Sequence, residues 1–302
     1  MKKKTVMAVP MACFWAVTAA CVLGIAVGSF KDFSINEALA NKTDLGAFFA
    51  AYGSYFSYCL YPAAGACLYV GLKKKGGQYR LLAWTLLLLG FFMAVYYSNS
   101  YSGKNVRALL GYTAGESSPL LSVLSWLFWA ALYAWVPFVM VKLLDDTDPD
   151  KLIAVGAAIL AAGITADNVN LWLKQVASRP RYKYLITLEN PGIEYRQWWQ
   201  MIPNLAGSND NFKSWPSGNM TIASMMFSLP MLADVTKKRN EGRNLRCFIV
   251  ACAFVLVYGY NRIHMTNHFL SDVCFGTLIT YLLYALISTA FLKAAENMEN
   301  RP

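Results

Sequence analysis

The sequence is short of charge and of histidine. Only 15% of its 302 residues are charged and two are histidines, whereas 57% are hydrophobic. A soluble globular domain usually contains about 45–50% apolar and about 25% charged residues, and a disordered chain has low hydrophobicity. Both classes are excluded, and the composition is typical of a polytopic membrane protein.

Acidic residues are scarce beside basic ones. There are 17 Asp and Glu against 27 Lys and Arg, a net charge of +10. A nucleic-acid-binding protein would gather such an excess into one patch, whereas here the cations are spread between apolar runs. The excess therefore indicates cytoplasmic loops, and no nucleic-acid partner is expected.

No CxxC pair and no metal-ligand spacing occurs among the seven cysteines, which are Cys13, Cys21, Cys59, Cys67, Cys247, Cys252 and Cys274. All lie within apolar runs, so we expect buried free thiols that pack as small hydrophobes. Neither a disulfide framework nor a metal site is predicted.

Eight apolar runs are candidate membrane helices: residues 6–28, 45–72, 81–97, 120–141, 152–173, 217–235, 245–260 and 273–292. The first follows three lysines, as in a signal peptide, but its length favours a retained helix. No repeat, linker or low-complexity segment divides the chain. We predict an all-α polytopic membrane helix bundle of about eight transmembrane helices, forming one domain over residues 1–302.

The loop charges orient this bundle. With the N-terminus in the cytoplasm, the inside segments carry 16 of the cations and the outside segments 11. This bias agrees with the positive-inside rule. We therefore expect a multi-pass protein of the cell membrane with both termini cytoplasmic.

The outer cations cluster with polar residues in three segments, 174–182, 215–219 and 261–272. All three lie at helix ends on the same predicted side of the membrane. Lys174, Arg181 and Arg262 suit a phosphoryl group, because arginine binds its oxygens in pairs. Ser217 and Gly218 open a predicted helix, where free N–H groups also favour an anion.

A histidine and an aspartate complete this candidate site. His268 and Asp272 are four residues apart and share a helix face, so the carboxylate can hold the imidazole in one tautomer. The other ring nitrogen is then free to attack phosphorus. The predicted reaction is phosphoryl transfer through a phosphohistidine, on the extracytoplasmic side.

Taken together, the three segments resemble the type 2 phosphatidic acid phosphatase superfamily, which comprises membrane lipid phosphatases whose site is shared with vanadium haloperoxidases. Its pattern is K-x6-R-P, then P-S-G-H, then S-R-x5-H-x3-D. The chain fits the spacing of all three motifs, with Tyr182, Asn219 and Asn261 at the proline, first-histidine and serine positions.

The resemblance implies a role for each matching residue. Lys174, Arg181, Ser217, Gly218 and Arg262 would bind the substrate phosphate, His268 would be the nucleophile and Asp272 its orienting partner. No metal or other cofactor is implied. The resemblance also implies a six-helix core whose motifs lie in residues 152–292, so that residues 1–150 hold two additional helices.

Asn219 stands where the family has a histidine that protonates the leaving oxygen. Three explanations remain open: an engineered inactivating substitution, a natural enzyme whose leaving group needs no acid, and a pseudophosphatase that only binds or moves phospholipids. The second favours a polyprenyl diphosphate, such as undecaprenyl diphosphate, because a lipid monophosphate leaves as a stable anion.

Two other polar residues have open interpretations. His264 is either a replacement acid or an interfacial histidine. Asp167 lies in a predicted membrane helix seven residues before Lys174, so it is either a functional group or the ion-pair partner of that lysine.

The sequence thus predicts an integral membrane lipid phosphatase acting on a lipid phosphate or diphosphate. A lipid phosphotransferase would use the same residues, and a non-catalytic lipid-binding protein is the alternative from another class.

Overall fold

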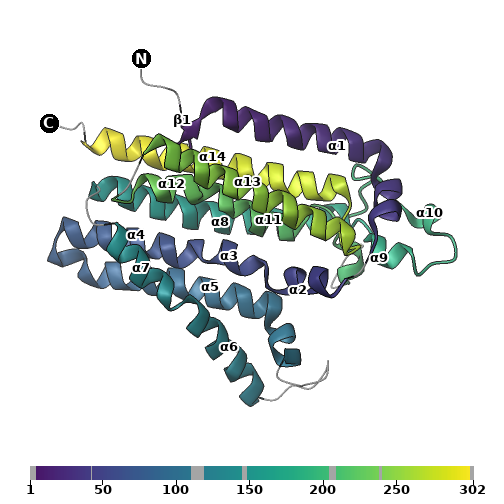
Figure 1. The fold of residues 1–302 in the computed structure, drawn as a ribbon, viewed down its shortest axis with the longest axis horizontal. Helices are drawn as coiled ribbons and strands as arrows, with labels where there is room; N and C mark the ends of the chain where they lie inside the picture. The colour runs from purple at the N-terminus through teal and green to yellow at the C-terminus, as the bar shows by residue number, and fades with distance from the viewer. Residues whose placement is uncertain are drawn as a thin grey trace. The chain divides into compact units, whose positions relative to one another are not determined.

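The computed structural model describes residues 5–41, 43–109, 119–144, 148–203, 209–237 and 240–299, and these are almost entirely helical (Figure 1). The long helices are α1 (Met11–Leu39), α4 (Leu60–Lys75), α5 (Arg80–Leu109), α6 (Pro119–Tyr133), α8 (Pro149–Ala177), α13 (Glu241–His264) and α14 (Leu270–Glu299). The only described strands, β1 (Thr5–Val6) and β2 (Val9–Pro10), pair antiparallel ahead of α1.

Short helical segments connect the long ones. They are α2 (Asp44–Tyr52), α3 (Ser54–Tyr58), η1 (Gly77–Tyr79), α7 (Trp135–Leu143), α9 (Tyr182–Leu185), α10 (Pro191–Glu194), η2 (Asp210–Phe212), α11 (Gly218–Ser224), η3 (Met225–Ser228) and α12 (Leu229–Asp234).

Six helical stretches among the described residues are long and apolar enough to cross a membrane: Met11–Leu39, Gly77–Ser102, Pro119–Leu143, Pro149–Leu185, Glu241–His264 and Leu270–Met298. Each contains or overlaps one of the predicted spans. The all-α polytopic membrane bundle predicted from composition is confirmed. Several cations used to orient it lie outside the described residues, namely Lys2–Lys4, Lys42, Lys238, Arg239 and Arg301.

The other two predicted spans are broken into shorter helices. Residues 45–72 fall into α2, α3 and α4, which are separated by single residues, Gly53 and Cys59. Residues 217–235 fall into α11, η3 and α12, where Pro230 lies in the first turn of α12. Proline has no N–H to continue the preceding ladder, and a 3₁₀ turn precedes it as a result.

The chain divides into two compact units. Unit 1 comprises Met1–Gly53, Gly163–Phe227 and Ile249–Ala285, and unit 2 comprises Ser54–Ala162, Ser228–Phe248 and Leu286–Pro302. Helices α8, α13 and α14 contribute residues to both. All three motif segments fall within unit 1.

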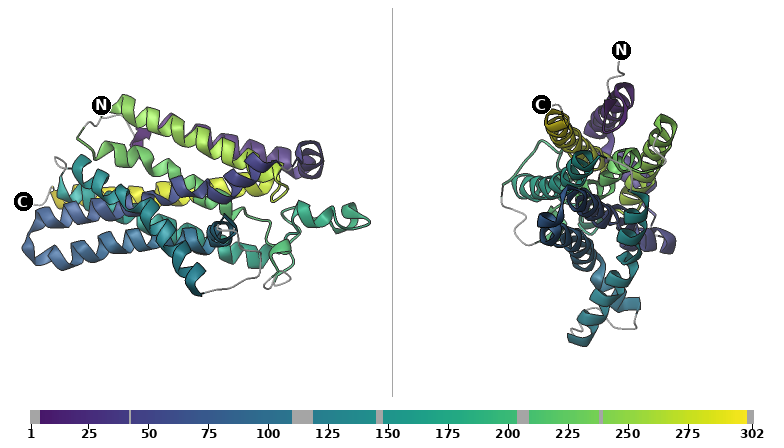
Figure 2. Two further views of the ribbon diagram at one scale, coloured as in Figure 1. Left: turned by 60° about the horizontal axis from the view of Figure 1, so that its bottom comes forward. Right: turned by 90° about the vertical axis from the view of Figure 1, so that its left-hand side faces the viewer.

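Unit 2 is built on the antiparallel pair α4 and α5, which lie side by side in both views (Figures 1 and 2). A side chain at Gly90 would collide with the Tyr61 carbonyl, so glycine permits this close approach. Two polar contacts connect elements within this unit: Ser98 and Tyr133 share a hydrogen bond of 2.6 Å, and Lys151 lies 2.6 Å from Asp234.

Unit 1 has an aromatic core between α1 and α14. Phe14 of α1 stacks on Tyr281 of α14 at a centroid distance of 5.4 Å, and Phe227 packs on the same ring at 4.6 Å. The seven cysteines are free thiols, but the prediction that all of them are buried is wrong: Cys21 and Cys67 are buried and the other five are partly exposed. This core holds α1 beside the helix that follows His268.

Candidate active site

The end of α8 places the first motif. Lys174 lies in its last turn, and the Lys174 Nζ donates a hydrogen bond to the carbonyl of Lys213 (2.8 Å). Ser178 then takes a positive φ of 44°, the left-handed conformation that often ends a helix. This reversal of the chain brings Arg179 and Arg181, two residues apart, into different surroundings.

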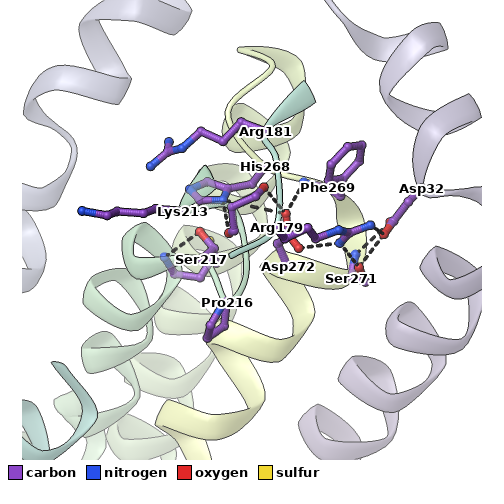
Figure 3. Close-up of polar contacts among 12 residues, drawn as sticks. Asp32, Arg179, Arg181, Lys213, Pro216, Ser217, His268, Phe269, Ser271 and Asp272 are labelled. Carbon is purple, nitrogen blue, oxygen red and sulfur yellow. Dashed lines mark hydrogen bonds and ion pairs between the residues drawn. The ribbon is translucent and has the colours of Figure 1, made fainter. Parts of the chain in front are cut away.

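The Arg179 guanidinium is buried, with 2% of its surface exposed, and is fully engaged. Its Nε donates to the Arg196 carbonyl (2.8 Å). Its two terminal nitrogens donate to Asp272 Oδ1 (2.6 Å), Ser271 Oγ (2.8 Å), Asp32 Oδ2 (3.0 Å) and Tyr195 Oη (3.2 Å), a network drawn in part in Figure 3. Because two carboxylates already occupy it, this arginine is not an open phosphate ligand.

Asp272 connects the three motifs. Its Oδ1 accepts from Arg179, and its Oδ2 accepts from the Ser214 hydroxyl (2.5 Å) and the Phe269 N–H (2.9 Å). Its main-chain carbonyl accepts from the Ser217 N–H (3.0 Å). One buried residue of α14 therefore fixes the segments that follow α8, precede α11 and begin α14.

The His268 imidazole is buried and held by a carbonyl. Its Nδ1 lies 2.8 Å from the main-chain carbonyl oxygen of Ser214. A carbonyl oxygen can only accept a hydrogen bond, so Nδ1 carries the proton. The same Nδ1 lies 4.0 Å from Asp272 Oδ2, beyond hydrogen-bond distance. Asp272 thus acts on the imidazole through Ser214 rather than directly, and Nε2 is left unprotonated.

The turn after α13 brings Arg262 against His268. The Arg262 carbonyl accepts from the N–H groups of Asn267 (3.0 Å) and His268 (3.3 Å). The turn requires a left-handed residue, and Thr266 supplies it with a φ of 60°. The five-residue spacing of the third motif is the length of this turn.

Two cations of the predicted cradle are buried without a carboxylate partner among the described residues. Arg262 is 3% exposed, lies over the ring of Tyr258 at 5.2 Å and donates one hydrogen bond, from Nη2 to Asn261 Oδ1. Its Nε is buried and has no hydrogen-bond partner in the part of the chain that the structure describes. Lys174 is 8% exposed and bonds only a carbonyl. Unpaired buried charges are costly, so both are suited to an incoming anion.

Arg181 is partnered by an exposed aspartate. Its Nη2 lies 2.8 Å from Asp210 Oδ1, and its Nε donates to the Asp210 carbonyl (2.9 Å). Partial burial acts to raise the pKa of Asp210, but the charges of Arg181 and Lys183 lower it on balance. This pair is accessible, since the Asp210 side chain is 64% exposed.

Three cations act electrostatically on His268. Burial lowers the pKa of His268 well below its usual value of 6.5, and the charges of Arg181, Lys174 and Arg262 lower it further. In Figure 3 the side chains of Arg181 and Lys213 extend on the same side as the His268 ring. The neutral imidazole therefore lies within a cluster of positive charge.

Ser217 and Gly218 lie at the start of α11, next to Lys174. Ser217 Oγ caps α11 by accepting from the Met220 N–H (3.4 Å). A Cβ at Gly218 would lie 3.1 Å from Asn170 Oδ1 and 3.4 Å from Lys174 Cε. Glycine therefore lets Lys174 lie close against the start of α11.

Asn219 is buried, with 6% of its surface exposed, and in the described part of the chain its amide has no hydrogen-bond partner. His264 makes its contacts elsewhere.

The His264 Nδ1 lies 2.9 Å from the Leu39 carbonyl oxygen, and the His264 ring stacks on Tyr260. Asp167 makes no ion pair with Lys174 within the described ranges.

Several residues of the site escaped the sequence motifs. Ser214 holds His268, Asp210 pairs with Arg181, and Asp32 and Asn36 reach the site from α1. The one available signal was the polarity of Asp32 and Asn36 directly after an apolar run. Among the described residues, no group of three or more His, Cys, Asp or Glu side chains could hold a metal ion.

Comparison with known proteins identifies the family. The family model described as PAP2 superfamily matches residues 151–296, which include all three motifs. No curated protein and no solved structure matches the chain. Residues 151–296 of this membrane protein therefore belong to the PAP2 superfamily, as the motifs predicted.

Proposed function

We propose that the protein removes the terminal phosphoryl group from a lipid diphosphate through a phosphohistidine at His268. The PAP2 domain and the membrane helices support a phosphatase-type protein with a lipid substrate. The observation that carries the proposal is the pair of buried, carboxylate-free cations, Arg262 and Lys174, beside a buried imidazole. A phosphoryl group would supply the negative charge that this arrangement lacks.

The tautomer of His268 supports its role as nucleophile. Because Nδ1 donates to the Ser214 carbonyl, the lone pair of Nε2 is available. The low pKa of His268 keeps the ring neutral at physiological pH. When Nε2 bonds to phosphorus, the bond from phosphorus to the bridging oxygen breaks, and the ring carries a positive charge until the second step.

Asn219 supports a diphosphate over a monoester. An alkoxide leaving group needs a proton, and an amide cannot give one. A lipid monophosphate departs as an anion with no proton transfer. Water then attacks phosphorus, the bond between nitrogen and phosphorus breaks, and the proton from water leaves with inorganic phosphate. The imidazole returns to its starting state.

The test is phosphate release from undecaprenyl diphosphate, phosphatidic acid and phosphatidylglycerol phosphate in detergent. We expect turnover of the diphosphate and little of the two monoesters. Asn219→His should raise monoester turnover by about 10²-fold or more, since a general acid contributes about 10²–10⁴-fold. His268→Gln should abolish all turnover, whereas His264→Gln should not.

Trapping of the phosphohistidine with a diphosphate that is labelled in its terminal phosphoryl group separates two alternatives. If His268 takes up this label but phosphate is not released to water, the protein is a phosphotransferase. If no labelled His268 forms, even with Asn219→His, the protein is a lipid-binding pseudophosphatase and the proposal fails.

A further inference from the structure

Helix α1 lies outside the PAP2 region, yet two of its side chains are buried in the site. Asp32 is 1% exposed and Asn36 is fully buried, and a spacing of four residues puts both on one face. The helix as a whole packs little: only 11% of its most apolar window is buried inside the protein. Two of the four buried residues of α1 are therefore polar, Asp32 and Asn36, and the other two are Cys21 and Gly28.

Asp32 uses both carboxylate oxygens to hold residues next to His268. Oδ1 accepts from the Ser271 N–H (3.0 Å). Oδ2 accepts from the Ser271 hydroxyl and from Arg179 Nη2 (3.0 Å), as Figure 3 shows. Arg179 in turn donates a hydrogen bond to Asp272, so Arg179 connects Asp32 with the carboxylate of the third motif.

Asn36 holds the backbone of His268 itself. Its Nδ2 donates to the His268 carbonyl (3.1 Å). Just beyond α1, the Asn41 N–H donates to the His264 carbonyl (3.1 Å). Helix α1 and the residue Asn41 that follows it therefore bind the turn between α13 and α14 by hydrogen bonds on both sides of Thr266.

The charges of Asp32, Arg179 and Asp272 also connect α1 to the reaction at His268. Asp32 and Asp272 place two carboxylates on the one guanidinium of Arg179, so the three groups have a net charge of −1. Without Asp32 the pair would be neutral. A fixed negative charge behind the imidazole stabilises the positive charge that its ring gains during phosphoryl transfer.

We propose that Asp32 and Asn36 are positioning residues for His268, so that α1 is part of the active site. This inference rests on the proposed function for its catalytic consequence, but the contacts it invokes exist without substrate.

The test compares Asp32→Asn and Asn36→Ala with Glu37→Gln, an exposed carboxylate on the same helix as a matched control. At saturating diphosphate, Asp32→Asn and Asn36→Ala should form phosphohistidine about 10–10²-fold more slowly, since small misplacements of a reacting group cost this much. The affinity for inorganic phosphate should stay within about twofold, because the hydrogen bonds of Asp32 and Asn36 go to Ser271, Arg179 and His268 rather than to the proposed phosphate ligands. Glu37→Gln should change neither quantity.

A spectroscopic measurement keeps the inference independent of turnover. The chain has two histidines, so His264→Gln assigns the ¹⁵N signals of labelled imidazoles directly. Asp32→Asn and Asn36→Ala should shift the His268 signals, and Glu37→Gln should not. Unchanged His268 signals overturn the inference, as does unchanged phosphohistidine formation. Parallel loss of phosphate affinity also overturns it, because that indicates general unfolding. Absence of phosphohistidine in the unaltered protein instead defeats the proposed function.

Discussion

Two buried arginines of unit 1 have opposite roles. Arg262 has a buried Nε without a partner in the described chain, whereas Arg179 makes two ion pairs. We predict that Arg262→Met raises the free energy of unfolding by about 1 kcal/mol or more, because it removes an uncompensated buried charge. Phosphate binding and turnover should be lost.

The measurement is unfolding in detergent with and without inorganic phosphate. Phosphate should stabilise the unaltered protein and leave Arg262→Met unaffected. A variant less stable than the parent in phosphate-free buffer would contradict this prediction.

Arg179→Met is the matched counterpart. It strands Asp32 and Asp272, two buried carboxylates that share this guanidinium. Breaking a buried pair by removing one partner costs about 3–5 kcal/mol, so we expect a loss of stability of that order or failure to fold. Equal effects of Arg179→Met and Arg262→Met on unfolding would show that the two sites do not differ.

The low pKa of His268 makes stability depend on pH. The folded state holds the imidazole neutral, while the unfolded chain binds a proton near pH 6.5. This contribution to stability is therefore complete above pH 6.5 and is lost as the pH falls below it. We predict that stability falls less between pH 7 and pH 5 in His268→Gln than in the parent, as measured by denaturant unfolding. His264→Gln is the control, and an unchanged slope in His268→Gln would refute the prediction.

Sequence spacing predicted the individual cations but not their partners. Lys174, Arg181 and Arg262 all follow from the motifs, and the charges of all three lower the pKa of His268, after the larger effect of burial. The K-x6-R spacing selects Arg181, but it does not show that Arg179 is bound by two carboxylates or that Arg181 pairs with an exposed aspartate. That distinction depends on Asp32, more than 140 residues earlier in the chain.

At the scale of elements, the turn between α13 and α14 carries a strained residue. Thr266 is β-branched and has a φ of 60°, and its buried hydroxyl has no hydrogen-bond partner among the described residues. A left-handed conformation costs a non-glycine residue about 1–2 kcal/mol. We predict that Thr266→Gly stabilises the protein by up to about 1 kcal/mol after the entropic cost of glycine.

Thr266→Val is the control for this prediction. It removes the unpaired hydroxyl but keeps the branched side chain and the strain. Melting temperatures in detergent should rank Thr266→Gly above Thr266→Val, and the reverse order would contradict the assignment of strain.

Helix existence was easier to predict than helix continuity. Apolar runs of about 20 residues identified every long helix, because length and hydropathy are local properties. The breaks within 45–72 and 217–235 were not predicted. Gly53 and Cys59 have ordinary helical angles, and their N–H groups still bond to the carbonyls four residues earlier, so nothing local to these two residues marks a break. The first run was predicted to end at residue 28, but α1 continues to Leu39 because its polar end is buried against the site.

At the scale of the whole molecule, the loop charges predict which side of the membrane the site faces. Glu194 lies in the long loop after α8, and Glu241 begins α13; both are exposed. A membrane-impermeant maleimide should label Glu194→Cys in intact cells and Glu241→Cys only after permeabilisation. The parent, with its seven free thiols, gives the background. Labelling of Glu241→Cys alone in intact cells would invert the predicted topology.

Asp272 also limits how this protein can recombine with its relatives. Its carboxylate and carbonyl bind groups from two separate stretches of sequence, Arg179 after α8 and the segment Ser214–Ser217 before α11. A chimera that exchanges one of these stretches replaces a hydrogen-bond partner of Asp272 by the corresponding segment of a relative, whose geometry fits the aspartate of that relative. Functional crossovers should therefore fall outside residues 174–272, so that the three motifs are inherited together.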